Sequence, residues 1–243
     1  MSLDRSRPPA PGAEHLFRFP AFEHHRLGNG LALYLAAHGS VPLVSAALLE
    51  PAGGQYNPLS RPGLSALTAA MLDEGSERRS APELAAAAER SGGALATGAD
   101  WNVAWASASA LATHLGTCLE LVAEVVRTPT FPEAEVERLR RQIFAELLRR
   151  HDQPAALAED ALAAALYSGT PYGSPLVGTR EAVESVARAD LQANWARLFG
   201  PQDAALVVAG DLDPARARSE IERLFGDWTP QSAPAPPQIV PAA

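Results

Sequence analysis

Six histidines are spread along the 243-residue chain, and their spacing decides whether the sequence could bind a metal by itself. A catalytic zinc site needs about three protein ligands, often two of them three or four residues apart on a helix. None of these histidines has another histidine or an acid at ligand spacing on a convincing helix. His24 and His25 are neighbours, so on a strand they would point to opposite faces. We therefore expect no metal site from these residues: His15, His24, His25, His38, His114 and His151.

Nucleophilic catalysis and phosphate binding have equally little support. The sequence lacks a Gly-x-Ser-x-Gly motif, and no serine has a recognisable histidine and aspartate set. Cys118, in "TCLELVAEVV", lies among apolar residues, where we expect a buried, inert thiol. Gly28-Asn29-Gly30 is followed by a strand-like run instead of a helix, so it predicts a hairpin turn. An autonomous enzyme with an unrelated site is therefore disfavoured.

Composition narrows the class of protein further. Hydrophobic residues make up 47% of the chain, and the net charge of -8 comes from acids and bases that alternate along the sequence. No basic patch indicates nucleic acid or an anionic membrane surface as a partner. The single cysteine excludes an internal disulfide, and no apolar run approaches the roughly twenty residues of a membrane span. We expect a soluble protein, without a signal peptide at its start, in the cytoplasm or the periplasm.

The chain divides into one domain and two tails. Residues 1–16 are rich in proline, glycine and arginine, which predicts a flexible N-terminal tail. Residues 229–243 are rich in proline and alanine, which is typical of a linker or tail that joins a domain to another one. Residues 17–228 should form the folded domain.

The first half of this domain should alternate extended runs with helices. "HHRLGNGLALYLAA" predicts a hairpin, and "VPLVSAALLEPAGG" predicts a further strand. Apolar spacing predicts a helix over 63–72, and a capping box predicts another that begins at Ser80. "GGALATGADWNVAWASASA" predicts two strands joined near Gly98, with Trp101, Val103 and Trp105 on one face that we expect to be core.

Helices dominate the second half. Apolar residues at helical spacing follow Cys118, and the longest helix should start at Pro132, with acids early and bases late as its dipole favours. Further helices are predicted over 154–167, 179–187 and 190–199, the last capped by Asp190. "DAALVVAGDLDP" predicts a buried strand, and Asp213-Pro214 should open a final helix. The predicted class is α+β, with helices packed on a largely antiparallel sheet.

Segments in one particular order connect the chain to a known family. In sequence they are "GLSALTAAMLDEGS", "SAPELAAAAERSGGALATGADWNVAWASASA", "LELVAEVVRTPTFPEAEVERLRRQIFAEL", "PYGSPLVGT" and "ALVVAGDLDP". This order resembles the pitrilysin, insulysin and mitochondrial processing peptidase family of inverted zincins, over nearly the whole chain. The resemblance implies one domain of the metallopeptidase fold, from a bacterial protein.

The resemblance also implies where a zinc site would lie. Active members carry G-x-x-H-x-x-E-H-M, in which two histidines bind zinc and the glutamate is the general base. Gly63 and Met71 anchor that pattern on this sequence. The first histidine then falls on Ala66, the glutamate on Ala69 and the second histidine on Ala70. A degenerate zinc site without catalytic residues, bound metal or cofactor is therefore expected.

One carboxylate of that site remains in the sequence. The family's third ligand, a glutamate on a long downstream helix, falls on Glu146. Glu146 is either a remnant of the old site or an acid that pairs with Arg141, Arg149 or Arg150 on a solvated helix, and we favour the ion-paired role. The alanine-rich run "ALTAAM" also has a simpler interpretation as helix-forming sequence, because "ELAAAAER" and "ALAAAL" occur elsewhere in the chain.

For function, the resemblance implies the inactive partner subunit of a two-chain zinc peptidase. Its partner would be a catalytic homologue with H-x-x-E-H, or a second homologous domain, and it would help to form the chamber and hold peptide. Peptide would add as a strand beside Leu95, Ala96 and Thr97, although an ordinary strand edge is as good an interpretation. Tyr172 resembles part of a family turn and is not expected to be catalytic. The alternative is a scaffold protein that keeps the fold without any role in proteolysis.

Overall fold

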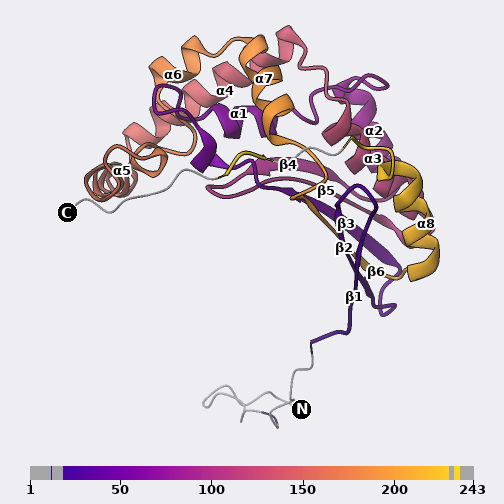
Figure 1. The fold of residues 1–243 in the computed structure, drawn as a ribbon. Helices are drawn as coiled ribbons and strands as arrows, with labels where there is room; N and C mark the ends of the chain where they lie inside the picture. The colour runs from indigo at the N-terminus through magenta and orange to yellow at the C-terminus, as the bar shows by residue number, and fades with distance from the viewer. Residues whose placement is uncertain (1–11, 13–18, 230–232, 236–243) are drawn as a thin grey trace, which may run out of the picture.

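A computed structural model describes residues 12, 19–229 and 233–235 of the chain. A twisted sheet forms one layer, and the helices arch over one side of it as a second layer (Figure 1). Most of the predicted tails, and the first residues of the predicted domain from residue 17, lie outside the described residues. No helix in the described ranges is long and apolar enough to cross a membrane.

The sheet confirms the predicted α+β class. Its six strands follow the order β1-β2-β6-β3-β5-β4, and only β2 and β6 pair in parallel within the described sheet. The predicted hairpin is β1 and β2, but β6 lies between β2 and β3, so β3 does not continue that hairpin as a neighbour. The strands are Glu23–Arg26 (β1), Ala32–Ala37 (β2), Leu43–Glu50 (β3), Leu95–Ala99 (β4), Ala104–Leu111 (β5) and Ala205–Gly210 (β6).

The helices begin close to their predicted starts because the capping residues act as expected. The backbone N–H of Ser80 donates to the Glu83 carboxylate at 2.8 Å, and the Asp213 carboxylate accepts from Ala215 N–H at 2.8 Å. The helices are Leu64–Ala70 (α1), Ala81–Arg90 (α2), Leu115–Arg127 (α3), Glu133–His151 (α4), Pro154–Leu166 (α5), Arg180–Ser185 (α6), Arg188–Leu198 (α7) and Pro214–Phe225 (α8).

The predicted cap of α7 is wrong in position. This helix begins at Arg188, so Asp190 lies inside its first turn. The Asp190 carboxylate accepts a hydrogen bond from Ala187 N–H at 2.9 Å, reaching back across the start of the helix. Asp190 still satisfies one of the free N–H groups at this end, but from within the helix.

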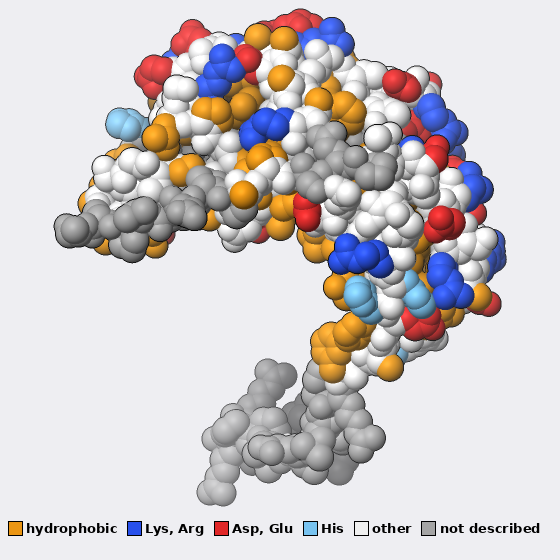
Figure 2. Space-filling view, in the orientation of Figure 1, with side chains coloured by type: hydrophobic (Ala, Val, Ile, Leu, Met, Phe, Trp, Pro, Cys, Tyr) orange, Lys and Arg blue, Asp and Glu red, His pale blue; other side chains and the backbone are white. Residues whose placement is uncertain are grey.

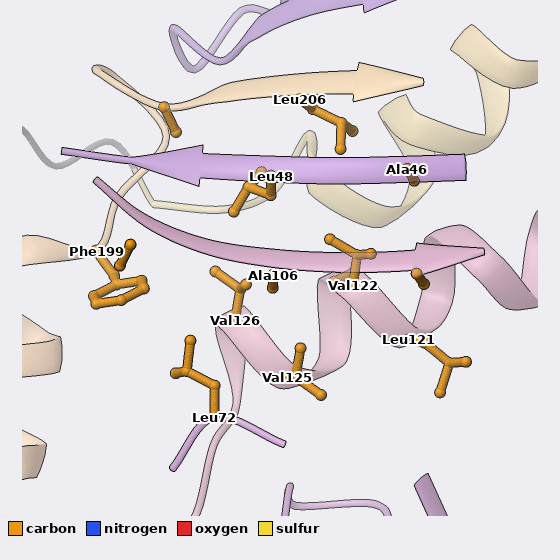
Figure 3. Close-up of a cluster of buried hydrophobic side chains, with 14 of the residues drawn as sticks. Ala46, Leu48, Leu72, Ala106, Leu121, Val122, Val125, Val126, Phe199 and Leu206 are labelled. Carbon is orange, nitrogen blue, oxygen red and sulfur yellow. The ribbon is translucent and has the colours of Figure 1, made fainter. Parts of the chain in front are cut away.

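The core lies between the sheet and α3. Side chains of α3 point at the buried residues of β3, β5 and β6, as Figure 3 shows for Val122, Val126, Leu48, Ala106 and Leu206. Cys118 is fully buried, as predicted, and its thiol donates to the carbonyl of Ala108 at 3.3 Å. Burial raises the pKa of the Cys118 thiol to about 11, so at neutral pH it remains a protonated thiol.

The other face of the sheet is left uncovered by the helices. Along β2, β3, β5 and β6, buried residues that face the helices alternate with half-buried or exposed ones. Charged side chains gather instead over the helical layer (Figure 2). In the described part of the chain, this face of mixed apolar, aromatic and serine side chains has no second layer packed on it.

The tryptophan prediction needs correction for this reason. The turn between β4 and β5 lies at Asp100–Val103, not near Gly98, so Trp101 and Val103 precede β5 and do not alternate along it. Trp105 belongs to β5 but is only half-buried, on the uncovered face. Its indole lies across the strand on Gly98, where a Cβ would come within 2.7 Å of the ring. Trp105 therefore covers a glycine at the sheet surface and is not part of the core.

Candidate functional site

Helix α1, which carries the degenerate zinc motif, is held in place by its backbone and by small polar groups. Gly63 precedes it with φ of 90°, and a Cβ there would lie 2.7 Å from the Cα of Gly178. Asn57 accepts from Ser65 N–H at 2.8 Å, which satisfies a free donor of the first turn. Inside the helix, Thr68 accepts from the Asn194 amide at 3.1 Å. These contacts fix α1 without any metal.

The three positions of the motif present only methyl groups. Ala69 is fully buried in the core, and Ala66 and Ala70 are half-buried on the same short helix. Residues three and four apart on a helix lie on one side, so the spacing that zinc would need is present. The donor atoms are missing, because alanine has no side-chain oxygen, nitrogen or sulfur.

Glu146, the remaining carboxylate, is engaged on its own helix. It forms an ion pair with Arg149, three residues further along α4, and the Glu146 side chain is 36% exposed. Of the alternatives, the structure therefore has the ion-paired arrangement. Among residues 12, 19–229 and 233–235, no group of three or more histidine, cysteine, aspartate or glutamate side chains is arranged to hold a metal ion. The residues present do not fit a catalytic zinc.

The residues proposed to bind peptide lie on a strand at the edge of the sheet. Leu95, Ala96 and Thr97 belong to β4, which pairs with β5 on one side and ends the described sheet on the other. Ser109 N–H donates to the Ala94 carbonyl at 2.9 Å, which starts the ladder. Antiparallel pairs alternate, so Ala96 bonds to β5 while the backbone groups of Leu95 and Thr97 point to the open edge.

One side-chain hydrogen bond links strand β4 to the turn that follows helix α1. The Thr97 hydroxyl donates to the Asp73 carboxylate at 3.0 Å, and Asp73 lies in the turn after α1, three residues beyond its last residue, Ala70. Burial raises the pKa of Asp73, while the bond from Thr97 acts in the opposite direction. The degenerate motif and the free edge are thereby held side by side (Figure 1).

Tyr172 has a structural role in the turn Pro171–Gly173. Its hydroxyl lies 3.1 Å from the Asn102 side-chain oxygen and 3.3 Å from that of Gln55. Its ring packs on Trp101 with a centroid distance of 5.1 Å. The turn is thus tied to the β4–β5 connection, in keeping with the interpretation of Tyr172 as part of a turn.

A buried carboxylate, Glu50, had no signal in the sequence. It ends β3, is 1% exposed, and neither carboxylate oxygen has a hydrogen-bond partner among the described residues. Burial raises the pKa of Glu50 well above its usual range, and the negative charge of Asp203 acts in the same direction. The sequence shows only that an acid ends an apolar strand. Whether that acid is buried depends on β5 and β6, which flank β3 in the folded sheet.

An open cavity of about 580 Å³ was also missed. It lies between the 55–61 segment, helix α7 and the 169–171 loop, with Pro234 and Ala235 contributing to its wall. Its charged lining residues are Arg61, Asp190 and Arg197. They are far apart in the sequence, so no local motif could have brought them together.

The fold defines a class, the metallopeptidase-type α+β domain, and at the three positions where the resemblance places zinc ligands and a general base this chain has alanine. The sequence profile of the insulinase family, peptidase family M16, matches residues 33–180, and the profile of the peptidase M16 inactive domain matches residues 185–243. The chain belongs to the insulinase family, peptidase family M16. This confirms the resemblance drawn from the sequence segments.

Relatives in this family carry both active and inactive descriptions. An uncharacterized zinc protease of Rickettsia bellii is 24% identical over 86% of this chain and 50% of its own length. A protein described as the non-peptidase homolog YmxG of Helicobacter pylori is 24% identical over 66% of this chain and 37% of its own length. The chain spans about half the length of the first of these relatives.

Solved structures agree with the fold. The peptidase M16 inactive domain from Pseudomonas fluorescens superposes with a TM-score of 0.84 and 26% identity, covering 91% of this chain and 54% of that one. The periplasmic protease PqqL from Escherichia coli reaches a TM-score of 0.82 at 18% identity, over 94% of this chain and 26% of that one. The second similarity concerns the fold alone.

Proposed function

We propose that this chain is the non-catalytic partner in a two-chain zinc peptidase, where it forms part of the chamber and holds the peptide substrate. The observation that carries the proposal is the side chains of α1: Ala66, Ala69 and Ala70, where the resemblance places the family's zinc ligands and general base, have no functional group. The chain itself would not be an enzyme. Zinc and the general base would come from the partner, a homologue with an intact H-x-x-E-H.

Two further features support this role. The edge of β4 has outward-pointing backbone groups at Leu95 and Thr97, which suits addition of an extended peptide as a further strand. The uncovered face of the sheet, where leucine and tryptophan side chains lie among serines, is suited to a second layer from a partner chain or from a second homologous domain. Both features are surfaces of the kind that a subunit without catalysis would need.

The experiment is reconstitution with the homologue from the same genome that carries H-x-x-E-H. The two proteins should co-elute in a stoichiometric complex, and the complex should hydrolyse unstructured peptides that neither chain hydrolyses alone. A catalytic homologue that is fully active alone and does not bind this chain would contradict the proposal. That result would favour the alternative, a scaffold protein that keeps the fold without proteolysis.

Peptide binding at β4 is tested by a proline at position 97. Thr97→Pro removes an N–H group that points to the open edge and leaves the ladder with β5 in place. Thr97→Val is the matched control, because it also loses the hydroxyl bond to Asp73 but keeps the N–H. We expect a tenfold or greater rise in KM of the complex for Thr97→Pro alone. Equal KM values for the two variants would rule out strand addition at this edge.

A further inference from the structure

The cavity between the 55–61 segment, α7 and the 169–171 loop has the size and shape of a ligand site. Its volume of about 580 Å³ lies within the range of roughly 300–1,000 Å³ that is typical of small-molecule pockets. Apolar side chains form much of its lining, including Leu59, Leu64 and Pro171. Such a cavity can take the body of an apolar ligand while a few polar groups orient it.

The charges that line the cavity do not cancel. Arg61 forms an ion pair with Asp190, so those two side chains neutralise each other. Arg197 lines the same cavity, and no carboxylate in the described ranges lies within ion-pair distance of it. The lining therefore carries one positive charge in excess, which suits a ligand with a single negative charge.

The guanidinium of Arg197 is held in position and still has free donors. Its Nη2 donates to the Tyr56 carbonyl at 3.2 Å and to the Asn194 side-chain oxygen at 2.9 Å. Both hydrogen bonds of this guanidinium start from Nη2, so Nε and Nη1 have no partner among the described residues. Nε–H and the Nη1 hydrogens point to different sides of Cδ, so a ligand carboxylate can accept one charge-assisted hydrogen bond from either of these nitrogens.

Asn194, which accepts a hydrogen bond from Arg197, is itself bonded to helix α1. Asn194 is 3% exposed and its amide donates to Thr68 at 3.1 Å, which fixes the amide so that its oxygen faces Arg197. The arginine is thus oriented by a buried amide that is itself hydrogen-bonded. Because the Arg197 side chain is already ordered, it loses less conformational entropy when a ligand binds.

We propose that this cavity binds a ligand with one carboxylate next to an apolar group, such as a peptide C-terminus with an apolar last residue. Arg197 receives the carboxylate, and Leu59, Leu64 and Pro171 contact the apolar part. A phosphate dianion fits less well, because the cavity has only one uncompensated cation. The site is separate from the β4 edge and needs neither a catalytic partner nor strand addition.

The test is a calorimetric and NMR titration of the intact chain with acetyl-alanyl-leucine, its C-terminal amide, and inorganic phosphate. The free acid should bind at least tenfold more tightly than the amide or phosphate, with chemical-shift changes at α7 and the 55–61 segment. Equal affinity for acid and amide, tighter binding of phosphate, or no binding of the acid at millimolar concentration would overturn the proposal.

A charge placed in the cavity provides a variant that should leave the fold intact. Leu59 is 60% exposed, so Leu59→Asp should fold and cancel the excess positive charge, weakening the acid at least tenfold. Leu59→Asn has nearly the same shape as Leu59→Asp and loses the same apolar contact, but it adds no charge, so it should weaken the acid clearly less than Leu59→Asp does. Leu148→Asp, at a 67% exposed position outside the cavity lining, should bind as the unmodified chain does. Unchanged affinity in Leu59→Asp would refute the site. This outcome does not depend on a variant of Arg197, whose removal could disturb folding.

Discussion

Helices α1 and α4, on which the resemblance places the expected zinc ligands, differ in what fixes their side chains. Helix α1 is short and mostly buried, and hydrogen bonds from Asn57 and Asn194 hold it from both sides. Helix α4 is long, has Val136 as its one fully buried residue, and pairs Glu146 with a neighbour on its own surface. The position of α1 therefore depends on packing, whereas that of Glu146 depends on solvent and local charge.

Restoring the ligands gives the largest expected change in this comparison. Ala66→His, Ala69→Glu and Ala70→His together should allow zinc uptake by the folded chain, with Glu146 released from Arg149 as third ligand, because α1 keeps the helical spacing. Zinc content of the purified variant and its circular dichroism melt are the measurements. Adding Glu146→Gln should weaken zinc binding at least tenfold. A folded triple variant that takes up no zinc would mean that the motif is misplaced on the sequence.

The glycine before α1 should have the next largest effect. Gly63→Ala combines φ of 90° with a Cβ 2.7 Å from backbone atoms of Gly178 and Val177, so we expect a loss of about 3 kcal/mol of folding stability. Gly169→Ala has a similar φ of 74° but nothing within 4 Å of the new Cβ, and should cost only about 1 kcal/mol. Urea unfolding measures both. Equal losses would show that contact with the 178 loop does not hold α1.

Removing either of two hydroxyl groups on α1 should change the folding stability in opposite directions. Thr68→Val leaves the buried Asn194 amide without its acceptor and should destabilise the chain by about 1–2 kcal/mol. The Ser65 hydroxyl is buried without a partner in the described structure, so Ser65→Ala should be neutral or stabilising by up to about 1 kcal/mol. Thermal denaturation distinguishes them. Destabilisation by Ser65→Ala as large as that of Thr68→Val would contradict the hydrogen-bond assignment.

The smallest effect should come from α4. Arg149→Ala breaks the pair with Glu146, and since the Arg149 side chain is 67% exposed, the change in unfolding free energy should stay below about 0.5 kcal/mol. Repeating the measurement in 0.5 M salt should remove most of the difference. A loss above 1 kcal/mol would show that Glu146 and Arg149 do more than pair on the surface.

Local patterns predicted the elements of this fold, and long-range contacts account for what they missed. Helix α3 was predictable because its apolar residues repeat at helical spacing, and Asp213 marked the start of α8 through its own hydrogen bonds. The insertion of β6 between β2 and β3 joins segments more than 150 residues apart, which no local period reports.

The candidate site divides in the same way. The helix that carries Ala66, Ala69 and Ala70 was predictable because helical spacing is local, while their assignment as a degenerate zinc site stays a prediction; the edge position of β4 agrees with the strand expected there. The uncovered face that holds Trp105 and the cavity around Arg197 depend on which elements pack together. Sequence periodicity tells which side of a strand differs from the other, but not whether a second layer covers it.

Glu50 couples the folding of this domain to the binding of a proton. Because burial raises its pKa in the folded chain, the native state retains a proton there that the unfolded chain releases above its ordinary pKa of about 4.3. At any pH between the unfolded and the raised native pKa, folding therefore takes up a proton, and this carboxyl group weakens the fold progressively as pH rises from about 4 through its native pKa. Mild acidification would act on this domain as a stabilising ligand does, with the hydrogen ion as the ligand.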